Sequence, residues 1–177
     1  DFRKELEAHQ EKSRSASIGK FKGGLGGDSD KITRLHTAHH LVLAGLQKLF
    51  GKSVKQRGSN ITEERLRIDF SFDRKLTEEE RKYIEDFVND AIEKDLRVVC
   101  REMPKEQAEK LGAEMEFGAK YGDIVSVYSI EDSDGNIYSR EFCGGPHAES
   151  TGLLGTFKIK KEESSSAGVR RIKGVLL

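Results

Sequence analysis

Residues 140–152 read REFCGGPHAESTG, and residues 35–41, far upstream, read LHTAHHL. The upstream run has the apolar spacing of a helix, so His36 and His40, four residues apart, present both imidazoles on one helix face. Cys143 and His147 have the same spacing, but the glycines and the proline between them exclude an ordinary helix and indicate a tight loop after a strand. Three histidines and one cysteine form a donor set that zinc prefers. The sequence therefore predicts one metal site shared by a helix and a distant loop.

The rest of the sequence predicts helices and strands in an irregular order. A long helix should begin at Ser29 or Asp30 and end near Phe50, and it is apolar over so much of its surface that it should pack on more than one side. A second helix should begin at Thr77, where Glu80 completes a capping box, and end near residue 94. Strands are predicted over residues 54–60, 66–72, 96–102, 124–131, 137–142, 156–160 and 169–175, with a short helix over 105–111 and a hairpin turn at 134–135. This order predicts an α+β fold in which a mainly antiparallel sheet packs around a long central helix.

The first thirty residues differ in character from the rest. Residues 1–17 are polar and helix-prone, and residues 18–30 are rich in glycine but lack the strand and the closing Gly-Lys-Ser/Thr of a phosphate loop. We interpret residues 1–30 as an N-terminal connecting helix and a glycine-rich linker, and residues 31–177 as one zinc-containing domain. The chain begins with Asp1, which suggests a piece of something longer.

Composition narrows the class of protein. The 177 residues include 31 Lys and Arg and 31 Asp and Glu, so the formal net charge is zero and no global field attracts a nucleic acid or a membrane. Any RNA contact must therefore come from a local patch. The sequence has no long apolar run and no signal peptide, so we expect a cytoplasmic protein without a membrane partner. Of the two cysteines, Cys100 lies in an apolar, strand-like run and is expected to be buried or half-buried.

Further motifs accompany the two ligand-bearing stretches. The set reads LHTAHHL at 35–41, QRGS at 56–59, LRIDFS at 66–71, CGGPH at 143–147, TG at 151–152, GTFKI at 155–159 and AGVRRI at 167–172. In order and spacing it resembles the editing domain of alanyl-tRNA synthetase, which is shared with free-standing alanyl-tRNA editing proteins and, more distantly, with threonyl-tRNA synthetase. The glycine-rich FKGGL at 21–25 is similar to the segment before that domain in bacterial alanyl enzymes. The resemblance implies that residues 31–177 form a tRNA-editing domain excised from a synthetase.

The resemblance implies an aminoacyl-tRNA deacylase. Its substrate would be alanine tRNA whose terminal ribose is esterified with a wrong amino acid, chiefly serine and also glycine. A synthetase pocket discriminates poorly by size or by one hydroxyl, so a second, hydrolytic site supplies the missing selectivity. The implied cofactor is Zn²⁺, with His36, His40, Cys143 and His147 as its ligands. The implied partners are the acceptor end of alanine tRNA and the other domains of the synthetase.

Two further residues are candidates for the chemistry. Gln56 matches a position that the family uses near the reacting centre, where a side-chain amide could orient water or the serine hydroxyl. The alternative is that Gln56 is an ordinary residue of a surface strand with no role in the reaction. Thr37 lies beside the first predicted ligand and is either a site residue or a helix residue whose hydroxyl bonds its own backbone.

Four residues are candidates for binding substrate or tRNA. The backbone amides of Gly144 and Gly145 can approach a phosphate or carbonyl oxygen closely, unless the glycines serve only the geometry of the loop. Arg170 and Arg171 alternate on a predicted strand, so one of them is expected to contact the tRNA acceptor end and the other to be a solvated charge.

Two departures from the family pattern keep alternatives open. The familiar motif has Thr where this chain has His39, which is also one turn from His36 and could pair with it in place of His40; the resemblance favours His40. The motif also usually has Thr where this chain has Pro146. The Pro146 form is closer to threonyl editing domains, so editing of seryl-tRNA of the threonine type is one alternative. A free-standing editing protein is another. A third is a nonenzymatic tRNA-binding module stabilised by zinc, because four protein ligands would close the coordination shell unless Cys143 is loosely held.

Overall fold

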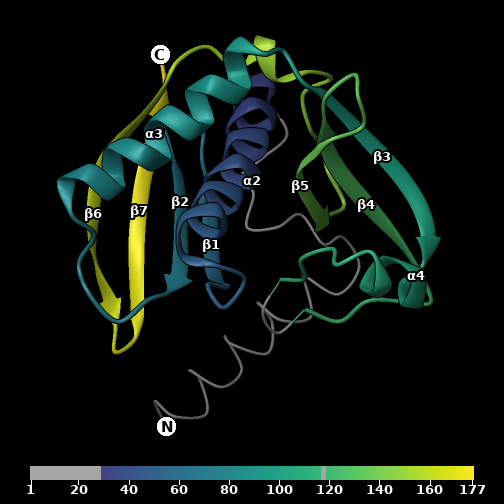
Figure 1. Ribbon diagram of the computed structural model, residues 1–177, viewed down its shortest axis with the longest axis horizontal. Helices are drawn as coiled ribbons and strands as arrows, with labels where there is room; N and C mark the ends of the chain where they lie inside the picture. Colours follow the sequence, from purple (N-terminus) through teal and green to yellow (C-terminus); the bar gives the residue numbers. More distant parts are fainter. Residues whose placement is uncertain (1–28, 117–118) are drawn as a thin grey trace, which may run out of the picture.

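The computed structural model describes residues 29–116 and 119–177 of the chain. Their elements are α2 (Asp30–Phe50), β1 (Gln56–Ile61), β2 (Leu66–Ser71), α3 (Glu78–Glu93), β3 (Arg97–Pro104), α4 (Lys105–Lys110), β4 (Ile124–Glu131), β5 (Ile137–Phe142), a 3₁₀ turn (Thr151–Leu153), β6 (Phe157–Ser166) and β7 (Val169–Leu176). The strands form two antiparallel sheets, ordered β1-β2-β7-β6 and β3-β4-β5 (Figure 1). The predicted α+β class is confirmed, and the strands are divided between two sheets. The predicted connecting helix and nearly all of the glycine-rich linker lie outside the described residues.

Helix α2 is the central element of the described fold. Its N-cap is Ser29, whose hydroxyl accepts a hydrogen bond from the Ile32 amide at 3.3 Å, and it ends at Gly51, whose φ of 96° suits a residue without a Cβ. The helix contacts β1 and β2 of one sheet, β5 of the other, and α3. Figure 1 shows α2 running between the two sheets, with α3 crossing above it and above the four-stranded sheet. This central position explains why α2 is apolar on more than one side.

Two apolar clusters hold the layers together. The larger one joins α2 and α3 to the four-stranded sheet, includes the fully buried side chains of Leu41, Leu46, Phe70 and Ile172, and also reaches Ile130 of the three-stranded sheet. The smaller one lies between α4 and the three-stranded sheet and contains Met103, Ala108, Val125, Val127 and Phe142. Burying one large apolar side chain stabilises a fold by roughly 1.5–3 kcal/mol. The two clusters therefore fix α2 and the end of β5 relative to their own sheets.

Strand β6 extends beyond its predicted end. The sequence predicted a strand over 156–160, whereas β6 pairs with β7 as far as Ser166. Residues 161–166 read KEESSS, which lacks the apolar alternation used to predict strands. Ion pairs across the hairpin replace apolar contacts there, including Arg170 to Glu162 at 2.6 Å and Lys173 to Glu163 at 3.3 Å.

The prediction that Cys100 is buried is wrong, because its side chain is exposed. It lies on β3, which pairs with β4 on one side only and so is an edge strand of the three-stranded sheet. Most of β3 is exposed or half-buried, so its apolar run reflects strand propensity and not burial. Within the described part of the chain, no helix has the length and the apolar character needed to cross a membrane.

Candidate metal centre

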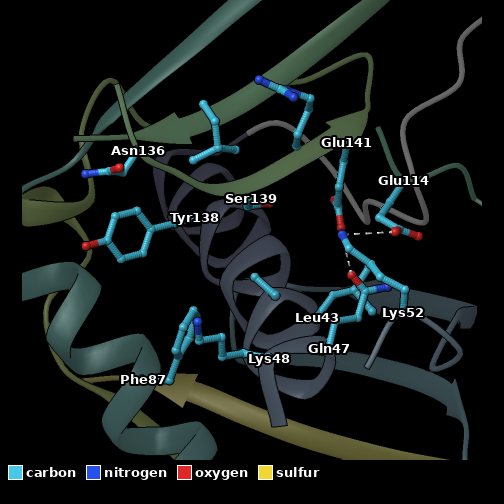
Figure 2. A pocket seen from close by; sticks show the side chains of 13 residues that line it. Leu43, Gln47, Lys48, Lys52, Phe87, Glu114, Asn136, Tyr138, Ser139 and Glu141 are labelled. Carbon is cyan, nitrogen blue, oxygen red and sulfur yellow. Dashed lines mark hydrogen bonds and ion pairs between the residues drawn. The ribbon is translucent and has the colours of Figure 1, made fainter. Parts of the chain in front are cut away.

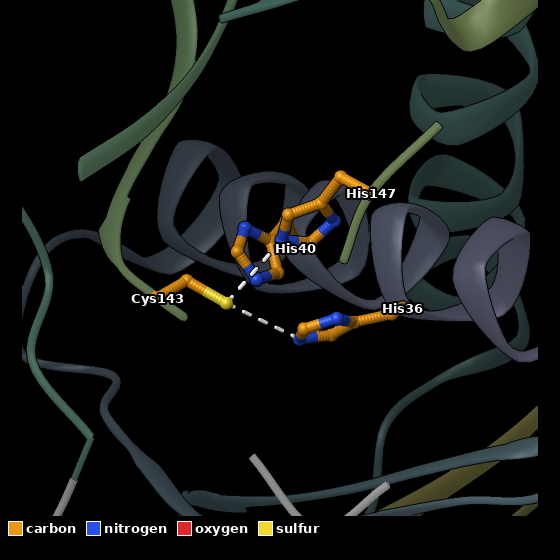
Figure 3. Close-up of side chains that lie close together, drawn as sticks. All are labelled: His36, His40, Cys143 and His147. Atoms are coloured by element: carbon orange, nitrogen blue, oxygen red, sulfur yellow. Dashed lines mark hydrogen bonds between the residues drawn. The ribbon is translucent and has the colours of Figure 1, made fainter. Parts of the chain in front are cut away.

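The structure brings together the four residues that the sequence predicted as metal ligands. His36 and His40 come from α2, and Cys143 and His147 come from the loop that follows β5 (Figure 3). One potential ligand atom from each residue lies within 4.8 Å of the other three. The Cys143 Sγ lies 3.4 Å from His36 Nε2 and 3.3 Å from His147 Nε2. His36, His40 and Cys143 are buried, and His147 is half-buried.

Each of the three histidines is held through its Nδ1 atom by a different acceptor. His36 Nδ1 lies 3.0 Å from the Pro146 carbonyl oxygen, and His40 Nδ1 lies 2.8 Å from a Glu141 carboxylate oxygen. A carbonyl and a carboxylate only accept hydrogen bonds, so each of these Nδ1 atoms carries the proton. The lone pair of each ring is therefore on Nε2, the atom that is free to bind a metal.

Thr37 fixes the third histidine in the same way. Its hydroxyl donates to the Thr33 carbonyl at 3.1 Å and accepts from the Ala148 amide at 3.0 Å. A hydroxyl has a single proton to donate, so the 3.1 Å contact with His147 Nδ1 requires the ring to be the donor. Thr37 thus makes the backbone bond expected of a helix residue, and it also orients a predicted ligand from behind.

The donor set fits zinc. Zinc binds thiolate sulfur at about 2.3 Å and histidine nitrogen at about 2.0 Å, which places these atoms about 3.5 Å apart in a tetrahedral shell. The two sulfur–nitrogen distances of 3.4 and 3.3 Å agree with that separation. Histidines anchored through Nδ1 to a carboxylate, a carbonyl or a hydroxyl are also typical of zinc sites. The residues could therefore hold a zinc ion, with Glu141, Pro146 and Thr37 supporting the ligands.

The electrostatics of the cluster favour one positive charge. Burial, followed by the proximity of His40, lowers the pKa of His36 to about 3, and the same two causes lower the pKa of His147 well below its usual value. Burial also lowers the pKa of His40, but the charges of Glu141 and Cys143 outweigh burial and raise it to about 10. A single cation is therefore stabilised beside Glu141 and Cys143, and a metal ion can take the place of the His40 proton.

Gln56 lies beside the metal centre. It is the first residue of β1, at a bulge where the pairing with β2 shifts between Gln56 and Gly58. A bulge re-aims a side chain relative to a regular strand. Gln56 lines a small cavity of about 20 Å³ together with His36, His39, His40, Leu43, Ser59, Glu114, Met115, Glu116, Glu141, Phe142 and Cys143. The sequence-predicted Gln56 thus shares one cavity with three of the four predicted ligands, His36, His40 and Cys143.

The two glycines of the loop differ in their surroundings. Gly145 is buried with a φ of 71°, and its amide donates to Cys143 Sγ at 3.4 Å. A Cβ on Gly145 would lie 2.5 Å from the Tyr128 hydroxyl oxygen. The Tyr128 ring packs edge-on against the His147 ring, with centroids 4.3 Å apart. Gly145 therefore serves the geometry of the loop and directs its amide to sulfur, while Gly144 is exposed.

Both predicted tRNA-binding arginines are engaged with carboxylates on the four-stranded sheet. Arg170 Nε lies 2.6 Å from Glu162, and Arg171 makes two hydrogen bonds to Asp69 at 2.8 and 3.0 Å. Neither lines the cavity at Gln56. Their contact with tRNA stays a prediction.

Sequence reasoning missed several residues around the cavity. Glu141 lies in the motif at residues 140–152, but the sequence predicted no role for it; its carboxylate accepts the hydrogen bond from His40 Nδ1. Glu116 comes from the loop after α4, and burial, with a further contribution from Glu141, raises its pKa to about 7. No local pattern marks Glu116, because its position depends on how that loop folds over β5. His39 was noted as a departure from the family motif, which was the available signal.

Two larger cavities adjoin this centre. One, of about 420 Å³, lies between α2, α3 and β5 (Figure 2), and Lys52 lines it with hydrogen bonds to Gln47 and Glu114. The other, of about 670 Å³, is lined by Lys52, Lys55 and Gln56 and by the loop after α4. Gln56 and Glu116 belong to both this cavity and the small one at the metal centre. The 670 Å³ cavity therefore gives solvent-side access to Gln56.

Comparisons with known proteins find relatives of this chain. A family model described as "Threonyl and Alanyl tRNA synthetase second additional domain" matches residues 125–173. An alanine–tRNA ligase of Treponema denticola is 52% identical over 176 residues, which is 99% of this chain and 28% of that protein. The ligase of Borreliella afzelii is 48% identical over 176 residues, 29% of its length, and that of Leptospira borgpetersenii is 47% identical over 140 residues, 14% of its length. The chain thus spans less than a third of the curated relatives it matches.

Proposed function

The chain belongs to the family of the second additional domain of threonyl and alanyl tRNA synthetases, and from this premise we propose that it hydrolyses mischarged alanine tRNA. The substrates are alanine tRNAs carrying serine or glycine, and the chain acts as the editing domain of a longer alanine–tRNA ligase. The observation that carries the proposal is the convergence of His36, His40, Cys143 and His147 beside Gln56, in a chain about half identical to alanine–tRNA ligases.

The reaction consumes one water. Its oxygen bonds to the ester carbonyl carbon, and the bond from that carbon to the ribose oxygen breaks. One proton of the water ends on the ribose oxygen, the other is released to solvent, and the amino acid leaves as a carboxylate. An aminoacyl ester is intrinsically labile, so positioning and oxyanion stabilisation suffice and no covalent nucleophile is needed.

The residues of the site divide this work. The Gln56 amide has a donor and an acceptor, so it can hold a water or a substrate hydroxyl at the cavity wall. A zinc ion held by this cluster would supply Lewis-acid polarisation of the ester carbonyl if Cys143 is loosely held, because four firmly bound protein ligands leave no open coordination position. Glu141, Pro146 and Thr37 keep the three histidine rings in place through their Nδ1 atoms. A rigid support of this kind keeps the reacting groups in register.

The tRNA acceptor end would approach through the 670 Å³ cavity. Lys52 and Lys55 lie at its rim with side chains 72% and 50% exposed, and both pair with Glu114. Exposed ion pairs contribute little to stability, so these lysines can turn to phosphate groups at small cost. The net charge of the chain is zero, which makes such a local patch the expected source of RNA affinity.

The test is release of serine and glycine from mischarged alanine tRNA by the wild type and by Cys143→Ala and His40→Ala. We expect release by the wild type and loss of release in both variants, with zinc content measured in parallel. Cys100→Ala is the matched control, because that thiol is exposed on β3. A wild type that releases neither amino acid from full tRNA or from an acceptor minihelix would contradict the proposal.

A second candidate is favoured by one observation. The cluster offers four donor atoms, enough to complete a tetrahedral zinc shell without an open position. Such a closed site would suit a nonenzymatic, zinc-stabilised module that binds tRNA without cleaving it. Binding of tRNA without release of the amino acid would support this candidate over the editing enzyme.

A further inference from the structure

His39 is a buried histidine whose ring nitrogens have no hydrogen-bond partner. It lies on α2 between the two helix ligands, is 3% exposed, and makes no bond through Nδ1 or Nε2 to any part of the chain that the structure describes. The other histidines of the cluster each have an Nδ1 acceptor. Buried polar atoms in folded proteins are nearly always satisfied by protein or by ordered water. The ring therefore needs a partner other than the described residues, and an ordered water is the ordinary one.

The surroundings of His39 show what that partner can be. His39 lines the same cavity of about 20 Å³ as Gln56, Ser59 and Glu116. A polar cavity holds a water when it has at least about 10–15 Å³ and offers two to four polar partners. This cavity meets both conditions for one water, and the metal cluster forms another part of its wall.

We propose that His39 and Gln56 together hold the water that attacks the ester carbonyl. This inference rests on the proposed function, and it adds a residue that lies outside the metal cluster. A neutral imidazole offers one donor and one acceptor, and the Gln56 amide offers both as well, so the two can bind a water from different sides. The oxygen of that water then bonds to the ester carbonyl carbon, and the bond from that carbon to the ribose oxygen breaks. One proton of the water ends on the ribose oxygen and the other is released to solvent.

The other ionisable groups of the cavity are already engaged or face the cluster. Glu141 accepts from His40, and Glu114 pairs with Lys52 and Lys55. Glu116 is close enough to Glu141 for the two charges to interact. A neutral His39 can make the proposed hydrogen bonds to the water without changing its charge. The proposal therefore concerns the position of the water and not the group that takes a proton from the water.

Two substitutions separate this role from a structural one. His39→Leu has a similar size but cannot form hydrogen bonds, whereas His39→Gln keeps a donor and an acceptor. We expect His39→Leu to keep its zinc content and to melt no lower than the wild type, because the imidazole has no hydrogen bond to the described residues and its removal leaves no protein group there unpaired. Its kcat for serine release should fall about 10-fold to 100-fold with KM unchanged. His39→Gln should recover most of the lost rate.

The choice of amino acid distinguishes water from the serine side chain. If His39 holds the water, seryl and glycyl esters lose rate equally in His39→Leu, because both need the same nucleophile. A loss confined to the seryl ester would overturn the proposal and assign His39 to recognition of the serine hydroxyl. An unchanged kcat in His39→Leu would overturn it as well.

A measurement on the wild type does not depend on how the variants fold. A crystal structure of the chain should show an ordered water within about 3.2 Å of a His39 ring nitrogen. A fully built cavity without that water would contradict the proposal. If the wild type releases neither serine nor glycine, the proposed function fails; if it releases both and the His39 variants match it, only this inference fails.

Discussion

At the scale of single residues, the ligand histidines depend on three unlike acceptors. A carbonyl, a carboxylate and a hydroxyl hold the Nδ1 atoms of His36, His40 and His147. Each acceptor fixes both the rotation of a ring and the position of its proton. A substitution that removes an acceptor should therefore lower the zinc affinity, although it replaces none of the four potential ligands.

Thr37 gives the cleanest test of this dependence. Thr37→Val keeps the shape of the side chain but removes the acceptor of His147 Nδ1 and of the Ala148 amide. We expect the zinc affinity to fall about 10-fold to 100-fold, as for other changes behind a metal ligand, measured by competition with a chromophoric chelator. Thr37→Ser keeps the hydroxyl and should bind zinc almost as tightly as the wild type. Equal affinities for the Val and Ser variants would show that the hydroxyl does not support the site.

Sequence patterns predicted the four potential ligands that the fold brings together, but not the residues around them. Pairs of His and Cys at a four-residue spacing are visible in the chain, and so is the glycine that the positive φ at Gly145 requires. Glu116 and the Pro146 carbonyl could not be found in this way, because they meet the site only through tertiary contacts. His39 departs from the family motif, yet only the folded chain shows that its ring nitrogens have no hydrogen-bond partner among the described residues.

At the scale of secondary structure, caps and turns set the helix and strand ends. The capping box at the start of α3 is present as predicted: the Thr77 hydroxyl accepts from the Glu80 amide at 3.1 Å, and the Glu80 carboxylate accepts from the Thr77 amide at 2.9 Å. Arg74 adds two hydrogen bonds to the same carboxylate at 2.7 and 2.9 Å. One carboxylate thus connects the helix start to the segment before it.

The capping box should contribute to the stability of the fold. Thr77→Ala should lower the free energy of unfolding by about 1 kcal/mol.

The same capping box predicts a pH-dependent stability. The hydrogen bonds from Arg74 lower the pKa of Glu80 to about 2, from its usual value of 4.5. A lowered folded-state pKa means that the stabilisation by Glu80 is complete above about pH 4.5 and is lost as the pH falls toward 2. The gap in unfolding free energy between the wild type and Glu80→Gln, measured in urea, should therefore shrink between pH 7 and pH 2.5; a constant gap would contradict this.

Strands were predicted correctly where apolar and polar residues alternate along the sequence. Strands β4 and β5 have the predicted bounds, because polar and apolar residues alternate along much of both strands and a turn that contains Gly135 separates them. Strand β6 continues where the alternation stops, since ion pairs hold its polar end. The misassigned burial of Cys100 has a related cause: a single strand does not reveal whether it lies at the edge of a sheet.

At the scale of the whole molecule, the metal cluster connects the central helix to the three-stranded sheet. The larger apolar cluster, which joins α2 to the four-stranded sheet, includes none of the four ligands. The described fold therefore has a core that does not depend on the ion. Binding to the folded state alone should still raise its stability.

Removal of zinc tests this division. We expect a chelator to lower Tm by about 10 °C, which corresponds to about 4 kcal/mol for a domain of this size, while the far-ultraviolet circular dichroism at room temperature stays unchanged. Hydrogen exchange should increase first in the loop after β5. The variant Cys143→Ser should show a smaller shift on chelation. Global unfolding on chelation would instead support a purely structural ion.

Because the net charge is zero, we expect RNA binding to depend on a few lysines. The double substitution of Lys52→Ala and Lys55→Ala should weaken binding of an alanine tRNA minihelix and lower the slope of log K against log salt by about 1 for each lost phosphate contact. Lys82→Ala on α3 is the control, since that lysine is 75% exposed and pairs with Asp86 within the helix. An unchanged slope in the double variant would place the RNA contacts elsewhere.

The separation of the ligands along the chain has a consequence for how the protein matures. His36 and Cys143 are 107 positions apart, yet their ligand atoms are in contact distance. Closing so long a loop is entropically unfavourable until the elements between the ligands have packed. Before that point an ion can find only one pair of ligands and will exchange rapidly. Tight retention of zinc would then begin only after α2 has docked against β5. A chain that retains zinc would therefore be one in which α2 and the loop after β5 have already packed together.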